Sequence, residues 1–227
     1  MSVRIICINF AHKSRICASM VLKTRDRLIE VARQLFARKG IENTTMNDIA
    51  SASEKGRRTI YTYFKNKRDI FNAVVEQETD ALMRKLTDIE NRDISATDKL
   101  EQYVACRFET MREIVSRNGS LKAGFFRDVR KVDRARKIIS GREIEILSRI
   151  LRQGQEAGQF AEGSAEHQAI VIVHCIHGLD IPYIRDNLSE QGMDQNMVMR
   201  QLTEIVLNGL RKRMPCDISV TPEHPHG

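Results

Sequence analysis

The chain has 227 residues, of which 41% are hydrophobic and 30% charged, and it carries a formal net charge of +7. This length can bury a substantial core, and the balance is that of a globular protein rather than a disordered or collagen-like chain. No run approaches the roughly 18–20 uninterrupted apolar residues that cross a bilayer, which excludes an integral membrane protein. Five scattered cysteines without a paired framework favour a reducing cytoplasm.

The positive charge is concentrated near the N-terminus. Residues 23–70 contain twelve basic and six acidic residues, and residues 1–22 contain three bases and no acid. The rest of the chain is close to neutral. This asymmetry indicates that one end of the molecule binds a polyanion while the other end has a different role.

We expect both ends of the chain to lie outside the folded domains. Residues 1–22 form either a disordered extension or a segment added by a start codon assigned too early, with Met20 as the true start. The apolar run from Ile5 to Phe10 is too short for a signal peptide and no small-residue cleavage site follows, so we expect a cytoplasmic protein. Residues 214–227 contain three of the four prolines and are predicted to be a disordered tail.

Three short helices are predicted in the basic segment. Apolar residues between Leu28 and Phe36 recur at helical spacing, which predicts a helix that ends near Gly40. Thr44 or Thr45 begins a second helix, and Asp48 stands three residues after Thr45, as in a capping box. After the polar stretch Ser53–Gly56, a third helix runs from Arg57 to Phe64.

The remainder of the chain alternates long amphipathic segments with brief polar breaks, and no strand-like alternation competes. We predict helices over residues 66–91, 96–117, 121–138, 140–157, 164–186 and 194–213. The predicted fold is therefore all-α. It has an N-terminal three-helix domain over residues 23–70 and a C-terminal helical bundle over residues 71–213.

Residues 45–64 have the length and pattern of a helix-turn-helix. The first of its helices would lie across a DNA duplex with Ile49 and Ala50 packed inward. The second would insert its N-terminal end into the major groove, with Ile60 and Phe64 anchoring its back. The alternative is a compact helical subdomain with a solvated basic face. The coincidence of bases, a small residue at the helix crossing and apolar anchors favours DNA binding.

Residues 24–70 resemble the N-terminal domain of TetR-family (tetracycline-repressor-like) transcriptional regulators. The resemblance lies in the stretches RLIEVARQLFARKGIENTT, NDIA and TIYTYFKNK. It implies three groups of DNA contacts. Thr45 would hold a phosphate, the base edges would be faced by Arg57, Arg58 and Thr59, and the DNA backbone would be contacted by Tyr61, Tyr63, Lys65 and Lys67.

The turn of the helix-turn-helix departs from the family pattern. Many members have Ala-Gly-Val-Ser where this chain has Ser53-Glu54-Lys55-Gly56, at the same length. The turn glycine and the apolar residue after it are thus replaced by Glu54 and Lys55, which leaves the turn geometry and its hydrophobic seal open. The arginine pair that follows can read guanine in a bidentate way or hold a backbone phosphate, and both interpretations stay open.

A single recognition helix reads few base pairs, so a pair of subunits on a twofold axis reading a palindromic operator is expected. The resemblance implies a homodimer through the helices near 164–186 and 194–213. The apolar candidates for this seam are Ile170, Val171, Val173, Ile176, Leu179, Ile181, Ile184, Met197, Val198, Leu202, Ile205, Val206 and Leu210. These residues can instead fill the core of the single chain.

The resemblance also implies a small-molecule pocket among the central helices. Candidate lining residues are Phe108, Met111, Phe125, Phe126, His174 and His177. The competing interpretation is ordinary core packing. His174 and His177 supply only two metal ligands where a closed site needs about four, so we expect neither a metal nor a cofactor.

The sequence predicts a DNA-binding transcriptional regulator, most simply a dimeric repressor released from its operator by a small molecule. One alternative is a non-specific architectural DNA-binding protein. Another is a helical-bundle enzyme, but no nucleophile–base pair, glycine-rich phosphate loop or HExxH spacing is present. We therefore expect no enzymatic activity.

Overall fold

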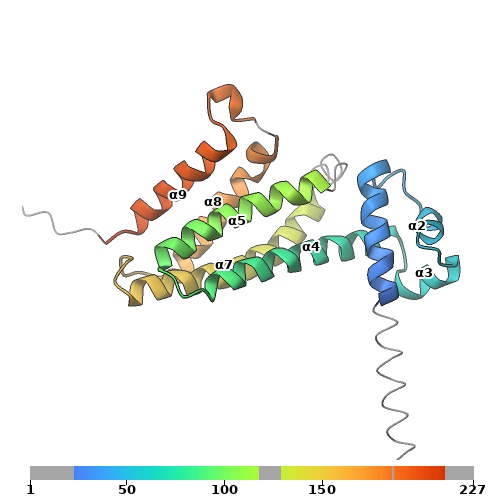
Figure 1. Ribbon diagram of the computed structural model, residues 1–227, viewed down its shortest axis with the longest axis horizontal. Coiled ribbons are helices and arrows are strands. Elements are labelled where there is room, and N and C mark those ends of the chain that lie inside the picture. The colour runs from blue at the N-terminus through green and yellow to red at the C-terminus, as the bar shows by residue number, and fades with distance from the viewer. Residues whose placement is uncertain (1–22, 118–128, 186, 213–227) are drawn as a thin grey trace, which may run out of the picture.

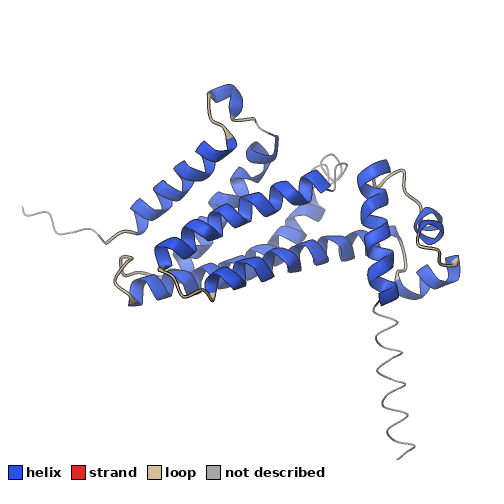
Figure 2. Ribbon diagram, viewed as in Figure 1, coloured by secondary structure: helices blue, strands red, loops and turns tan. Residues whose placement is uncertain are grey.

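The structure, a computed structural model, describes residues 23–117, 129–185 and 187–212. Within these ranges the regular elements are all helical, as Figure 2 shows, and the prediction of an all-α fold is confirmed. The expectations for residues 1–22 and for the C-terminal tail lie outside the described residues. No helix in the described ranges is both long enough and apolar enough to cross a membrane.

The N-terminal helices form where the sequence predicts them. A helix spans residues 23–39, followed by α2 (Met46–Ala52) and α3 (Arg57–Tyr63). The capping box at the start of α2 is confirmed. Thr45 Oγ1 accepts a hydrogen bond from the Asp48 amide at 3.0 Å, and Asp48 Oδ2 accepts one from the Thr45 amide at 2.9 Å. Such a cap stabilises a helix by about 0.5–2 kcal/mol.

Long helices make up the rest of the molecule. They are α4 (Lys67–Glu90), α5 (Ala96–Arg117), α7 (Val129–Glu156), α8 (Ala165–Arg185) and α9 (Gln195–Leu210), with a 3-10 turn at Ser189–Gln191. Four of these match predicted helices to within three residues at either end. Figure 1 shows α4 running from the N-terminal helices along the bundle formed by α5, α7 and α8.

The predicted break between residues 138 and 140 is wrong, because α7 is one unbroken helix of 28 residues. Residues 121–128 of the earlier predicted helix lie outside the described residues. Gly141, close to the predicted break, is exposed, and a methyl group at its position would meet no atom within 4 Å. A glycine in a helix costs only about 1 kcal/mol relative to alanine, which the packing of a long helix outweighs.

The hydrophobic interior consists of two clusters. We call the first the head core; it joins the residue 23–39 helix, α2, α3 and the start of α4. The second, the bundle core, joins the rest of α4 to α5, α7, α8 and α9. Helix α4 belongs to both, since Ile70 and Val74 lie in the head core and Leu82 and Leu86 lie in the bundle core.

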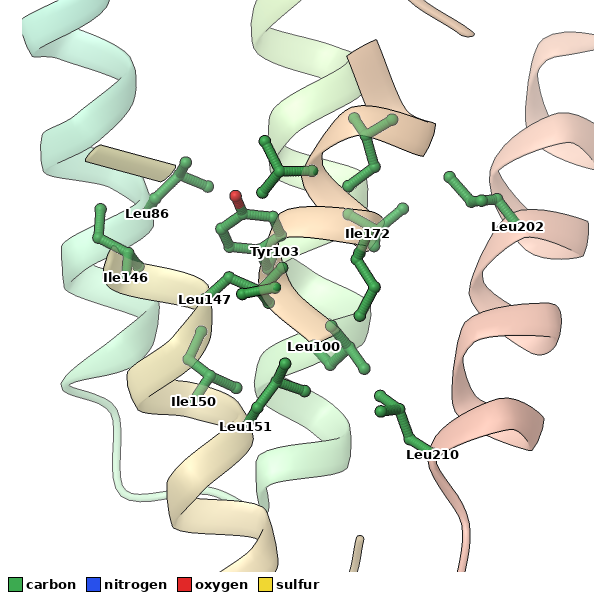
Figure 3. Packing of buried hydrophobic residues seen from close by; sticks show 14 of the residues in the cluster. Leu86, Leu100, Tyr103, Ile146, Leu147, Ile150, Leu151, Ile172, Leu202 and Leu210 are labelled. Carbon is green, nitrogen blue, oxygen red and sulfur yellow. The ribbon is translucent and has the colours of Figure 1, made fainter. Parts of the chain in front are cut away.

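The bundle core is closely packed. Figure 3 shows Leu86, Leu100, Leu147 and Ile150 around Tyr103, and all five side chains are fully buried. Burial of each large aliphatic side chain stabilises the fold by about 1.5–3 kcal/mol.

Candidate nucleic-acid interface

Helix α3 has a buried back and an exposed front. Ile60 is fully buried and Phe64, the residue that ends the helix, is 4% exposed, so the predicted anchors are confirmed. Arg57 and Arg58, at the N-terminal end, are exposed, and Thr59 is half-buried. Because the back of α3 is fixed in the head core, its first turn projects two guanidinium groups away from the protein.

The turn between α2 and α3 is built around Glu54. Its φ of 57° lies in the left-handed region, which glycine adopts freely and other residues at a cost of roughly 1–2 kcal/mol. Ser53 is buried and donates from Oγ to the Ala50 carbonyl at 2.9 Å, and the Lys55 amide donates to the same carbonyl at 3.0 Å. The turn therefore closes without the usual glycine, and Glu54 takes the strained conformation.

Lys55 stands where many TetR-family members have an apolar residue that covers the turn. The Lys55 side chain is exposed, so no apolar side chain covers the turn at this position. Gly56 precedes α3 with a φ of −64°, a conformation open to any residue. The left-handed position is thus at Glu54 and not at the glycine that the sequence offers.

Tyr61 contacts one of the exposed arginines of α3, Arg57. The Arg57 guanidinium carbon lies 5.9 Å from the centre of the Tyr61 ring, and Tyr61 is 44% exposed. A cation–π contact of this kind is worth about 0.5–1 kcal/mol at an exposed site and restricts the side chain. Tyr63, on another face, is partly buried against the head core.

The remaining predicted backbone contacts flank the helix-turn-helix. Thr45 and Lys65 are exposed. Lys67 instead is half-buried and donates from Nζ to the carbonyls of Ile41 at 2.5 Å and Glu42 at 3.2 Å. It thereby ties the loop before α2 to the start of α4, a structural role that the sequence pattern did not reveal. Its contact with DNA stays a prediction.

A buried network of charged side chains crosses the bundle. Arg107 of α5 donates from Nε to Glu143 of α7 at 2.5 Å and from both terminal nitrogens to Asp180 of α8 at 3.1 and 3.0 Å. His177 Nε2 lies 2.5 Å from Glu143 Oε2, and its Nδ1 lies 3.3 Å from Ser140 Oγ. All five residues are buried. We call this set the buried ion network.

The network lowers the pKa of Glu143. Burial alone would raise the pKa of this carboxyl, but the nearby Arg107 charge and the His177 hydrogen bond outweigh burial and hold the pKa below its ordinary value. Glu143 is therefore ionised, and the network binds three helices through charge-assisted hydrogen bonds. Sequence reasoning singled out His177 alone, because the two residues of each bonded pair in the network are 34 or more positions apart in the sequence.

The predicted pocket residues are dispersed. Phe108 and His177 lie in the bundle interior, where the Phe108 ring packs at 4.7 Å between centroids against Tyr183. Met111 is half-buried and His174 is exposed. Phe125 and Phe126 lie outside the described residues. Among the described residues, no group of three or more His, Cys, Asp or Glu side chains is placed to hold a metal ion.

Tyr103 is an interior polar residue that the sequence did not indicate. It is fully buried, and its hydroxyl finds no hydrogen-bond partner among the described residues. Burial raises the pKa of this phenol, with a further contribution from the Glu143 charge, so it remains protonated.

Several of the apolar residues predicted for a dimer seam fill the core of the single chain. Val173, Ile176, Val198, Leu202 and Leu210 are buried there, which favours the alternative interpretation for these residues. Four of the candidates are instead exposed large hydrophobic side chains, at 36–68% exposure. They are Ile170 and Val171 of α8, and Met197 and Ile205 of α9.

The second helix of this helix-turn-helix exposes two arginines and is anchored by its buried back, which is the geometry of a DNA-binding regulator. The family described as "Bacterial regulatory proteins, tetR family" matches residues 28–74. An HTH-type transcriptional regulator of Bacillus subtilis, YfiR, is 26% identical over 61% of this chain and 68% of its own length. The "Probable acrEF/envCD operon repressor" of Escherichia coli is 47% identical over 57 residues, which span 25% of this chain and 26% of that repressor.

Solved structures share the fold over most of the chain. A transcriptional regulator from Cytophaga hutchinsonii has 26% identity and a TM-score of 0.67, covering 82% of this chain and 97% of that one. The SmeT–triclosan complex, at 18% identity, has a TM-score of 0.61 and covers 90% of this chain and 100% of that one. The match to the tetR family thus covers residues 28–74, and the fold over most of the chain is that of solved bacterial transcriptional regulators.

Proposed function

We propose that this protein is a dimeric transcriptional repressor that binds a palindromic operator and is released from it by a small molecule. The carrying observation is α3, whose back is buried through Ile60 and Phe64 and whose first turn exposes Arg57 and Arg58. In this proposal the first turn reads base edges. The supporting contacts to phosphate come from Thr45, Tyr61, Tyr63, Lys65 and Lys67.

The proposed dimer uses the outer faces of α8 and α9. Val171 is 61% exposed and Ile205 is 68% exposed, so each of the two helices presents a large apolar side chain to solvent. Two copies of each helix around a twofold axis would form a four-helix seam that covers these side chains. Replacing Val171 and Ile205 with arginine should shift the protein from dimer to monomer in sedimentation. A dimer that survives both changes would argue against this seam.

The proposed effector site lies in the bundle, near Phe108, Met111 and His177. Its support is the family resemblance and the small-molecule complex of SmeT, a neighbour in fold. An effector changes operator affinity only through its different affinities for the two conformations of the protein. The proposal therefore requires a ligand that favours one particular conformation of the dimer. In that conformation the distance between the two N-terminal domains no longer matches the distance between successive half-sites of the operator. It implies a cytoplasmic protein without enzymatic activity.

The decisive experiment measures binding to a duplex from the region upstream of the protein's own gene, alongside a scrambled duplex of equal length. Arg58→Ala should lose about 1–3 kcal/mol of discrimination if Arg58 contacts a guanine in a bidentate way. Arg84→Ala is the matched control, because Arg84 is an exposed arginine of α4 in the bundle. Equal binding of both duplexes by the wild type, falling steeply with salt, would indicate a non-specific architectural protein instead.

A further inference from the structure

The start of the first helix lies beside the exit of the recognition helix. Figure 1 shows the beginning of the residue 23–39 helix, in dark blue, next to α3. The contact is specific: the Arg25 guanidinium carbon stands 5.5 Å from the centre of the Phe64 ring. Phe64 ends α3 and is itself buried in the head core. Arg25 is thus held against a fixed aromatic surface.

Arg25 keeps its charge available. It forms no ion pair within the described part of the chain, and it is half-buried rather than enclosed. Acidic side chains of the first helix and of α4 have partners of their own: Glu30 pairs with Arg33 at 2.6 Å, and Asp69 accepts from the Lys65 amide at 3.0 Å. A guanidinium held on a ring, without a carboxylate, is suited to an external anion.

The position of Arg25 relative to α3 indicates which anion. Helix α3 has seven residues and is therefore about 10 Å long, close to the roughly 12 Å width of the major groove. When its N-terminal end faces base edges, its C-terminal end reaches the sugar–phosphate backbone that borders the groove. Phe64, the exposed Lys65 and Arg25 are at that end.

We propose that Arg25 is a backbone-phosphate contact, positioned by the Phe64 ring, and that the DNA interface extends beyond the helix-turn-helix onto the first helix. This inference rests on the proposed operator binding. A phosphodiester contact of this kind adds affinity without sequence preference and fixes the orientation of the head on the duplex. The family resemblance assigned contacts only from Thr45 onward, so Arg25 adds a separate element to the interface.

The test is the salt dependence of binding by the full chain. Fluorescence anisotropy is measured with the upstream duplex and with the scrambled duplex between about 50 and 200 mM salt. Arg25→Ala should reduce the slope of log affinity against log salt by about 0.9 for each subunit bound, equally on both duplexes. Arg25→Lys should keep the wild-type slope but bind more weakly, because an ammonium cannot stack on the ring as a planar guanidinium does.

Matched controls separate the possible failures. Arg84→Ala removes the same charge from the bundle and should keep the wild-type slope. A wild-type slope for Arg25→Ala overturns the inference, and so does a loss confined to the upstream duplex, which would make Arg25 a base contact. Failure of the wild-type protein to prefer the upstream duplex refutes the proposed function instead, while the slope on the scrambled duplex still reports on Arg25.

Discussion

Replacing Arg107 with methionine tests the buried ion network directly. Methionine keeps a long unbranched side chain but removes the charge and three hydrogen bonds to Glu143 and Asp180. Those two carboxyl groups are 1% and 4% exposed as residues, so water does not replace the lost donors. Both buried carboxylates then lose their guanidinium partner, while Glu143 keeps its contact with His177.

The expected cost is large. Removal of one partner from a buried ion pair destabilises a protein by about 3–5 kcal/mol, because the remaining charge is uncompensated. A typical domain has only about 5–15 kcal/mol of unfolding free energy in total. For a chain of this size the change corresponds to a fall in melting temperature of roughly 6–20 °C.

Urea unfolding followed by circular dichroism measures this loss. The apolar variant that combines Arg107→Met, Glu143→Met and Asp180→Leu should recover most of it, because no charge stays buried. A double-mutant cycle between Arg107 and Glu143 should give a coupling energy of about 0.5–3 kcal/mol. A loss below about 1 kcal/mol for Arg107→Met would refute the reasoning, since it falls in the range of solvated surface pairs.

Three further predictions concern stability and are checked by unfolding measurements. Gly154→Ala should destabilise the protein by about 1–3 kcal/mol, because the new methyl group would lie 2.2 Å from the Phe160 ring. Gly141→Ala meets no atom within 4 Å and should stabilise the protein by about 0.5–1 kcal/mol, so similar effects for the two substitutions would contradict this packing. Glu54→Gly should stabilise by roughly 0.5–1 kcal/mol by relieving the left-handed residue, a gain that alanine there must not reproduce. Because the pKa of Glu143 is lowered in the folded protein, its ionised carboxylate stabilises the fold above the ordinary pKa of 4.5, and this stabilisation is lost as the pH falls through the folded pKa. The difference in unfolding free energy between wild type and Glu143→Gln should therefore shrink in acid, and a difference that does not change with pH would contradict the prediction.

Short-range sequence patterns predicted the N-terminal helices well. The capping box at Thr45 and the anchors Ile60 and Phe64 depend on residues three or four apart, and such spacings are visible in the sequence. The length of the four-residue turn was predicted, but its left-handed residue was not. A glutamate rarely takes a left-handed conformation, and Glu54 does so here because the turn must close between α2 and α3.

The bundle was predicted in outline and missed in detail. The predicted helix break between residues 138 and 140 was wrong, because local propensity does not report the packing that holds α7 along the bundle. The buried ion network joins residues 36 and 73 positions apart, a separation at which no periodic pattern identifies partners. The bonds from the Lys67 ammonium to carbonyls 25 and 26 residues earlier were likewise not visible in the sequence, and the DNA contact that the family resemblance implies for Lys67 stays a prediction.

Helix α4 has a mechanical consequence. Its 24 residues form a single helix about 36 Å long that contributes side chains to both the head core and the bundle core. A tilt of about 5° about the Glu90 end displaces the opposite end by roughly 3 Å over that length. This displacement approaches the roughly 3.4 Å rise between neighbouring bases along one strand. In the proposed mechanism, a tilt of this size in α4 would be enough to move α3 out of register with its half-site.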